Sequence, residues 1–299
     1  MVIWTRGGKD RAKCPFSSFK LAPFYEQNGA ILSDKYGFRN VYDISECDAI
    51  VLGSSVVFGE ESGSMTDFIH KHSSVQCYNI SFNAWRLPQI INQYLYRFID
   101  SPHKYVVLYS GYNEYLNNMS STFDRRPGHP YNFYWDEIIN DDAVWKSDET
   151  GYEIDLKIKR SHSELQDHLA ALAINEFSGE RFTPNDYLNM WISNLRFFSC
   201  ILQSYHKKFI CIPHIHLLDK PRPTSGERLI IDSWNPQYVN AYPQLAKSYW
   251  RCVHKNLDLF RLVGTTEVLS LYENSFIDSV HFTDLAYEAF AKAIARELD

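Results

Sequence analysis

The feature that most constrains the fold is an alternation of short apolar segments with longer segments of helical periodicity. The apolar segments are expected strands because each is short, apolar and followed by turn-forming residues. The expected strands are residues 48–53, 75–80, 105–109 and 208–213, and the expected helices are 87–99, 183–205, about 243–260 and 284 onwards. Single strands that alternate with such helices predict a parallel sheet with helices on both faces. The expected fold is therefore α/β, a three-layer sandwich around a central, mostly parallel sheet.

One domain of residues 1–299 is the expected organisation, since neither an internal repeat nor a convincing linker divides the chain. With 45% hydrophobic and 22% charged residues, the chain can bury a full core. Residues 1 to about 46 are expected to be an irregular N-terminal segment. Residues 116–160 lose the alternating pattern and read either as an insertion over the functional edge, a lid or substrate platform, or as an inert excursion. Smaller expectations are a helix at 161–176, a loop at 219–236 and a last strand at 266–271.

The charge of the chain bears on its partners. A formal net charge of −6 argues against nucleic acid or an anionic membrane as the main partner. The six cysteines are scattered without a C-x-x-C pair, which is typical of reduced thiols. No apolar run approaches the length of a membrane span, and the first residues do not resemble a signal peptide, so a cytoplasmic location is expected. Nothing in the sequence indicates the oligomeric state.

Polar side chains follow three of the expected strands, and a fourth polar pair precedes the last helix. Ser55 follows the first strand, the loop at 81–85 the second and Asn113 the third, while Asp278-x-x-His281 lies before the last helix. Each group has an ordinary structural explanation when it is taken alone. Together they point to one edge, because the carboxyl ends of parallel strands meet there and open α/β sheets bind their ligands at that edge.

The spacing of Asp278 and His281 suits proton transfer from a serine. Three residues of separation allow the carboxylate to hold one imidazole nitrogen, which leaves the other nitrogen to take a proton from Ser55. Two alternative chemistries have less support. The Gly-Ser-Ser stretch at 53–55 does not fit a dinucleotide or P-loop motif. His214-x-His216 could be a metal pair, but no third ligand lies nearby in the sequence.

These residues, in this order, resemble the SGNH (GDSL-type) hydrolase family. The stretch 53–59 is similar to the first block of the family, 111–114 to the third and 278–281 to the last, and the resemblance spans about residues 20–298. It implies the flavodoxin-like SGNH hydrolase fold. The sequence departs from the family pattern at three places. Ser54 and Glu114 each stand where the family usually has an aspartate, and the second block at 78–84 lacks its glycines.

The resemblance also implies roles for individual residues. Ser55 would be the nucleophile, His281 the base and Asp278 the residue that orients the base. The backbone N–H groups of Ser55 and Ala84 and the side-chain amide of Asn113 would form the oxyanion hole. Tyr112 and Glu114, which flank Asn113, are expected substrate contacts.

The expected function is serine-dependent hydrolysis of a small acyl ester, with acetyl on a carbohydrate as one case. A carbohydrate O-acyltransferase would use the same residues and pass the acyl group to a sugar hydroxyl in place of water. A catalytically silent binding module is the alternative from a different class, and the missing glycines of the second block motivate it. No metal or organic cofactor is expected. A small-molecule or carbohydrate ester is the expected partner.

Overall fold

The computed structural model of the protein describes most of its residues. They are 11–14, 18–21, 23–27, 30–59, 63–83, 85–116, 144–148, 151–155, 183–234 and 236–299. The predicted helix at 161–176 and the predicted oxyanion residue Ala84 lie outside them.

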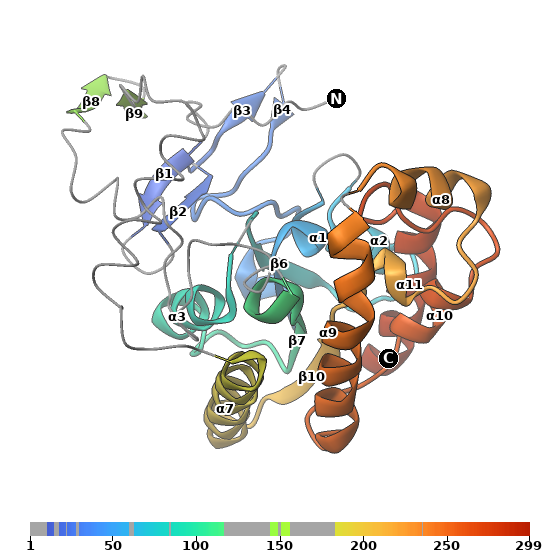
Figure 1. Cartoon of the computed structure of the whole chain (residues 1–299). Helices are drawn as coiled ribbons and strands as arrows, with labels where there is room; N and C mark the ends of the chain where they lie inside the picture. The colour runs from blue at the N-terminus through green and yellow to red at the C-terminus, as the bar shows by residue number, and fades with distance from the viewer. Residues whose placement is uncertain are drawn as a thin grey trace.

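The centre of the fold is a four-stranded sheet in which every pair of neighbours is parallel (Figure 1). Its strands, in spatial order, are β10 (Lys208–Pro213), β7 (Tyr105–Ser110), β5 (Ala49–Gly53) and β6 (Cys77–Ser81). The four strands expected from the sequence are all present, with ends shifted by no more than two residues. The prediction of an α/β fold with a parallel sheet is confirmed.

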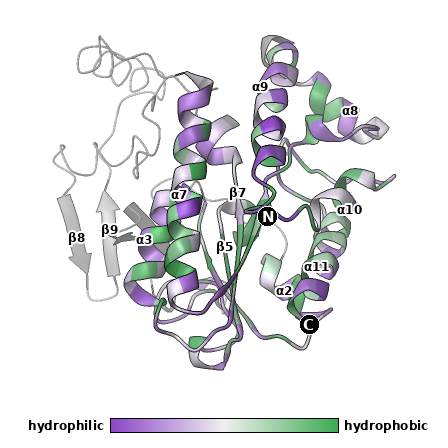
Figure 2. Ribbon diagram, turned by 90° about the horizontal axis from the view of Figure 1, so that it is seen from below, coloured by the Kyte–Doolittle hydropathy of each residue, from purple (hydrophilic) through white to green (hydrophobic). Residues whose placement is uncertain are grey.

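Helices cover both faces of the sheet, which gives the three layers seen in Figure 2. One face carries α3 (Leu87–Arg97), α7 (Pro184–Ser204) and α9 (Pro236–Lys255). The other carries α2 (Met65–His70), α10 (Thr265–Ser270) and α11 (Asp284–Leu298), with α1 (Ser55–Phe58) following β5. Thr183 and Pro184 begin α7 as the sequence predicts, because proline fits the first helical position.

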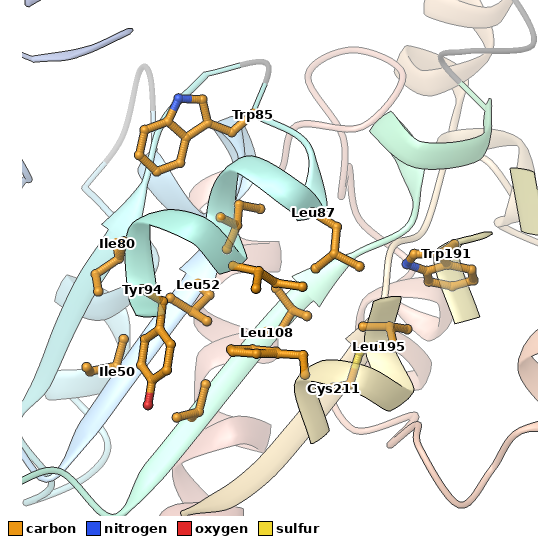
Figure 3. Packing of buried hydrophobic residues seen from close by; sticks show 14 of the residues in the cluster. Ile50, Leu52, Ile80, Trp85, Leu87, Tyr94, Leu108, Trp191, Leu195 and Cys211 are labelled. Carbon is orange, nitrogen blue, oxygen red and sulfur yellow. The ribbon is translucent and has the colours of Figure 1, made fainter. Parts of the chain in front are cut away.

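Successive residues of each strand point to opposite faces of the sheet, so the strands contribute to one core cluster on each face. Ile50 and Leu52 of β5 point into the cluster beneath α3 and α7, whereas Ala49 and Val51 point to the other face. Figure 3 shows the first cluster, in which Leu52 and Leu108 of the sheet lie between Tyr94 of α3 and Leu195 of α7. Burial of each such large side chain stabilises the fold by about 1.5–3 kcal/mol. The sheet edge that carries the site is thereby held rigid from both sides.

Small elements make up the rest of the described chain. The N-terminal segment holds two hairpins, β1–β2 (Arg11–Cys14, Ser18–Leu21) and β3–β4 (Glu26–Gln27, Ala30–Ile31), and a short helix, η1 (Ile44–Glu46). Within the predicted insertion, β8 (Val144–Asp148) pairs with β9 (Gly151–Asp155), and most of the remainder lies outside the described residues. The expected role of the insertion as a lid or platform therefore stays a prediction, as does the single domain.

Three predictions about the C-terminal half are wrong. Residues 266–271 do not form a strand: 266–270 belong to α10 and Leu271 is its C-cap, and the helix begins after Gly264, a residue with a φ of 77° that few side chains tolerate. The predicted loop at 219–236 contains a helix, α8 (Ser225–Asp232), which Thr224 caps by accepting from the Glu227 N–H. Helix α9 begins at Pro236, seven residues before the expected start, and continues through Pro243.

Two further findings bear on the expected location. No described helix combines the length and the apolar character that a membrane crossing requires. Free thiols are found at Cys47, Cys77, Cys200, Cys211 and Cys252. The cytoplasmic location stays a prediction.

Candidate active site

Ser55 occupies the first position of α1, two residues after β5 ends at Gly53. Helix α1 lies very close to the end of the strand, since a Cβ added to Gly53 would be 2.3 Å from Val57 Cγ2. Arg39 holds the other end of α1, because its guanidinium donates to the carbonyls of Phe58 (3.1 Å) and Gly59. These contacts give Arg39 a structural role. Ser55 is thus placed at the carboxyl edge of the sheet by a rigid turn.

Ser55, His281 and Asp278 form a continuous hydrogen-bonded chain. His281 Nε2 lies 2.7 Å from Ser55 Oγ, and His281 Nδ1 lies 2.5 Å from Asp278 Oδ2. A carboxylate beside Nδ1 favours the tautomer with the proton on Nδ1, which leaves Nε2 as the acceptor facing the serine. The structure brings together the three residues that the sequence singled out for proton transfer.

Asp278 is held in its ionised form by the groups around it. Its Oδ1 accepts from the backbone N–H groups of Val280 and His281, both at 2.8 Å. Burial acts to raise the pKa of Asp278, but the hydrogen bonds from the His281 side chain and from these backbone groups outweigh burial and lower the pKa to about 2. The carboxylate is therefore charged at neutral pH and able to stabilise an imidazolium.

Asn113 lies beside this chain on the turn that follows β7. It belongs to the short helical segment η2 (Tyr112–Leu116), and its side-chain amide donates to the carbonyl of Trp85 at 2.8 Å. An amide nitrogen has two N–H groups, so this bond fixes the side chain and leaves the second N–H for another acceptor. Trp85 follows directly after Ala84, and the hydrogen bond therefore ties the Asn113 turn to the loop that would carry the other oxyanion donor.

Glu114 is bonded within the protein at both carboxylate oxygens. Oε1 accepts from the Leu87 N–H (2.6 Å), and Oε2 accepts from the Gly111 N–H (2.9 Å) and from the Ser110 hydroxyl (3.2 Å). Burial raises the pKa of Glu114 although these backbone groups favour its charged form. A direct contact of Glu114 with a substrate stays a prediction, and such a contact would compete with these bonds.

Tyr112 packs against two histidines at the end of β10. Its ring lies 5.3 Å from that of His214 and stacks on that of His216 at 5.9 Å, with centroids compared in both cases. Burial lowers the pKa of His214 well below its usual value and that of His216 to about 3, so both rings are neutral. His216 Nδ1 accepts from the Leu218 N–H. Among the described residues, no group of three or more His, Cys, Asp or Glu side chains is placed to hold a metal ion.

Some groups around the site carry no signal that sequence reasoning could have used. Trp191 of α7 donates to Ser110 Oγ at 3.1 Å and thereby supports Glu114 from the core. Lys220 and Glu227 form an ion pair that is bonded to the segment leading to Asp278. The T-x-x-E spacing of Thr224 and Glu227 marks a helix start, but it says nothing of these tertiary contacts.

Comparison with known proteins found similar structures but no similar sequences. No model of a known protein family matches the chain, and no curated protein matches it in sequence. Many solved structures that are similar to it are GDSL-like lipases and acylhydrolases, the family whose sequence blocks the chain resembles.

Three of these structures illustrate the likeness. A GDSL-like lipase from Bacteroides thetaiotaomicron is 12% identical, with 85% of this chain and 88% of that chain covered and a TM-score of 0.42. The lipase/acylhydrolase from Enterococcus faecalis is 13% identical, with 84% and 95% covered and a TM-score of 0.41. An acetylxylan esterase from Geobacillus stearothermophilus is also 13% identical, with 84% and 93% covered and a TM-score of 0.41. Identities this low leave few side chains in common.

Proposed function

We propose that the chain is a serine esterase of the SGNH type that hydrolyses a small acyl ester. The observation that carries the proposal is the hydrogen-bonded chain from Ser55 Oγ through both nitrogens of His281 to Asp278. A serine hydroxyl is a weak nucleophile until a base takes its proton, and this arrangement supplies both the base and the group that orients it.

In the first half of the reaction, Ser55 Oγ attacks the ester carbonyl while His281 Nε2 takes the hydroxyl proton. Asp278 stabilises the imidazolium that forms. The tetrahedral intermediate then collapses, the C–O bond to the alcohol breaks, and His281 returns the proton to the departing alcohol oxygen. The product of this half is an acyl group on Ser55 and a free alcohol.

In the second half, water attacks the acyl group while His281 takes one of its protons, and the proton returns to Ser55 as the acid leaves. The Asn113 amide, which the Trp85 carbonyl holds in place, would donate to the oxyanion in both halves together with the backbone N–H groups of Ser55 and Ala84. A donor of this kind contributes roughly 3–4 kcal/mol to the stabilisation of the transition state.

The substrate that we favour is an acetyl ester of a carbohydrate. Tyr112 is partly exposed next to Asn113 and offers an aromatic ring on which a sugar could stack. The second candidate, a carbohydrate O-acyltransferase, would differ only in the acceptor of the second half. The silent binding module is disfavoured because the base is already within hydrogen-bonding distance of the nucleophile.

The test is hydrolysis of p-nitrophenyl acetate by the wild-type protein and by the Ser55→Ala variant, with Ser54→Ala as the matched control. Ser54 is the preceding serine, and its side chain makes no capping bond to α1, so its replacement should leave turnover unchanged. Turnover that disappears only in Ser55→Ala supports the proposal. Equal turnover in wild type and Ser55→Ala contradicts it.

A fluorophosphonate probe covers the case in which the pocket rejects p-nitrophenyl acetate. An activated Ser55 reacts with the probe, and the adduct is found by mass spectrometry of the peptide that contains this residue. Absence of both turnover and adduct in the wild type would reject the proposal in favour of a binding module. Where turnover occurs, acyl transfer to added sugars in excess of acetate release would favour the transferase.

A further inference from the structure

Lys220 and Glu227 form an ion pair in the interior of the protein. Both side chains have 0% exposure, and Lys220 Nζ lies 2.9 and 2.8 Å from the two carboxylate oxygens of Glu227. Lys220 follows the short helix η3 (Leu217–Asp219), and Glu227 lies in α8. Removing two charges from water is costly, and buried pairs of this kind often add little to stability compared with apolar residues. The pair therefore calls for an explanation other than stability.

One further hydrogen bond of the pair is local, from the Thr224 N–H to Glu227 Oε2 (2.9 Å), and four others go to the segment that leads to Asp278. Lys220 Nζ donates to the Glu273 carbonyl (2.7 Å) and to the Ser275 hydroxyl (2.9 Å). Glu227 Oε1 accepts from the backbone N–H groups of Ser275 (2.7 Å) and Phe276 (3.3 Å). Four directional bonds thus fix residues 273–276, which end two residues before the aspartate.

The segment between α10 and α11 has almost no regular structure, so its position depends on such bonds. Its tip is closed by a bond from the Ile277 N–H to the His281 carbonyl (2.9 Å), and Asp278 lies within this turn. The Leu217 N–H donates to the Ser279 carbonyl (2.8 Å), so η3 also holds the turn. The turn that carries both Asp278 and His281 is anchored at its base by the ion pair and at its tip by η3.

We propose that the buried Lys220–Glu227 pair positions the Asp278–His281 turn against Ser55. This inference rests on the proposed function for its effect on catalysis, since neither residue touches the reacting atoms. Directional bonds from a charged pair define the location of a loop more closely than apolar contacts do. A displacement of about 1 Å in a catalytic group can slow a reaction by about 10²-fold.

The test removes both charges together in the Lys220→Met/Glu227→Leu variant. A single replacement would leave one buried charge without its partner and could prevent folding, whereas the double apolar replacement keeps the volume filled. We expect a cooperatively folded protein in which kcat falls by about 10²-fold with little change in KM. We also expect the pH of half-maximal rate to shift, because the distance between His281 Nδ1 and Asp278 Oδ2 is no longer held at its wild-type value. In a His281→Ala background the double replacement should have no further effect on the residual rate.

The matched control removes an exposed ion pair in the same way. Arg196 and Asp258 lie 3.0 Å apart on the surface, and the Arg196→Gln/Asp258→Asn variant should retain the wild-type rate and pH profile. A folded Lys220→Met/Glu227→Leu variant with the same kcat and pH profile as the wild type would overturn the proposal.

A second readout does not depend on esterase activity. The proton between His281 Nδ1 and Asp278 should give a far-downfield ¹H resonance, assigned by its absence in His281→Ala. The resonance should move or broaden in the Lys220→Met/Glu227→Leu variant and stay unchanged in the surface control. If it moves in a protein whose wild type shows neither turnover nor reaction with fluorophosphonate, the positioning role stands and the esterase proposal fails. An unchanged resonance overturns the positioning role itself.

Discussion

Gly111 is the residue at which the backbone leaves β7 and turns towards Asn113. Its φ is 136°, in the region that side chains rarely adopt, and a Cβ built on it would lie 2.3 Å from the Tyr249 hydroxyl oxygen. Tyr249 cannot easily withdraw. It is buried, its ring stacks on Trp191 at 5.2 Å between centroids, and its hydroxyl donates to the His214 carbonyl. Gly111→Ala should therefore destabilise the fold.

The magnitude follows from two contributions. Strain of a non-glycine residue at such a backbone angle costs about 1–3 kcal/mol. Forcing an extra methyl group into a packed core costs about 1–3 kcal/mol more. The sum is about 2–6 kcal/mol, a large part of the 5–15 kcal/mol that is typical of a folded domain.

A second substitution tests the cause of this loss. Tyr249→Phe removes the atom at 2.3 Å but leaves ring carbons at 2.9 and 3.0 Å from the added Cβ, so relief should be partial. By itself Tyr249→Phe should cost about 1 kcal/mol for the lost hydrogen bond. In Gly111→Ala/Tyr249→Phe the total loss should be smaller than the sum of the single losses by about 1 kcal/mol.

Urea unfolding followed by tryptophan fluorescence measures all three variants, with Gly226→Ala as the control. Gly226 has an ordinary φ, lies in α8 and would place its Cβ 3.0 Å from the side-chain nitrogen of Asn274, whose oxygen accepts from Thr224, so this change should cost clearly less than Gly111→Ala. A free energy of unfolding for Gly111→Ala within about 0.5 kcal/mol of the wild-type value would refute the assigned strain and overpacking. Strict additivity of the double variant would refute the assigned contact with Tyr249.

Two further predictions concern charged residues of the site. Because the folded-state pKa of Asp278 is about 2 and its ordinary value is 3.8, this carboxylate stabilises the fold above about pH 4 and loses that contribution as the pH falls towards 2. Screening by solvent reduces the effect to about 1 kcal/mol, so urea titrations at pH 4 and pH 2 should show that much less acid sensitivity in Asp278→Asn than in the wild type. Glu114→Gln leaves a backbone N–H of Leu87 or Gly111 without its acceptor and should cost about 1–3 kcal/mol in urea unfolding. The same change should slow p-nitrophenyl acetate hydrolysis, since it loosens the turn that carries Asn113, and unchanged stability would show that these bonds contribute nothing.

The sheet could be predicted from the sequence because each strand is a short, nearly continuous apolar run. Ile50, Leu52 and Val51 read as buried on both faces, which is typical of a parallel sheet. The stripe of α11 was equally clear, since Tyr287 and Phe290 share the face that meets the core. Patterns of this kind are local, and the structure follows them.

The elements that were predicted wrongly or missed have weaker patterns in their local sequence. The six residues of α10 contain too few apolar positions to distinguish a period of 3.6 from a period of 2, and Val268 alone is buried among its apolar side chains. The proline- and glycine-rich surroundings of α8 concealed a helix whose Thr224 cap was present in the sequence. Pro243 suggested a helix start because proline favours the first turn, but α9 accommodates it in the interior.

The site was predictable to the extent that it depends on topology. Parallel strands bring Ser55 and Asn113 to one edge, and the i, i+3 spacing of Asp278 and His281 allowed them to pair. The Lys220–Glu227 pair was not predictable in this way, because its partners at 273–276 lie about 50 residues away on a segment without periodicity. Positions of that kind are set by tertiary packing, which leaves no local pattern.

The separation of 226 residues between Ser55 and His281 has a consequence for the newly made chain. All four strands of the sheet are complete once residue 213 has been made, so Ser55 can be in place while His281 has not yet been synthesised. At translation rates of about 5–20 residues per second, this interval from Ser55 to His281 lasts about 10–45 s. Chains interrupted by stalling or by a premature stop codon before residue 278 would keep Ser55 and lack Asp278 and His281, its proposed partners. If the proposed function holds, such fragments would not hydrolyse esters, because the Ser55 hydroxyl would have no base to take its proton.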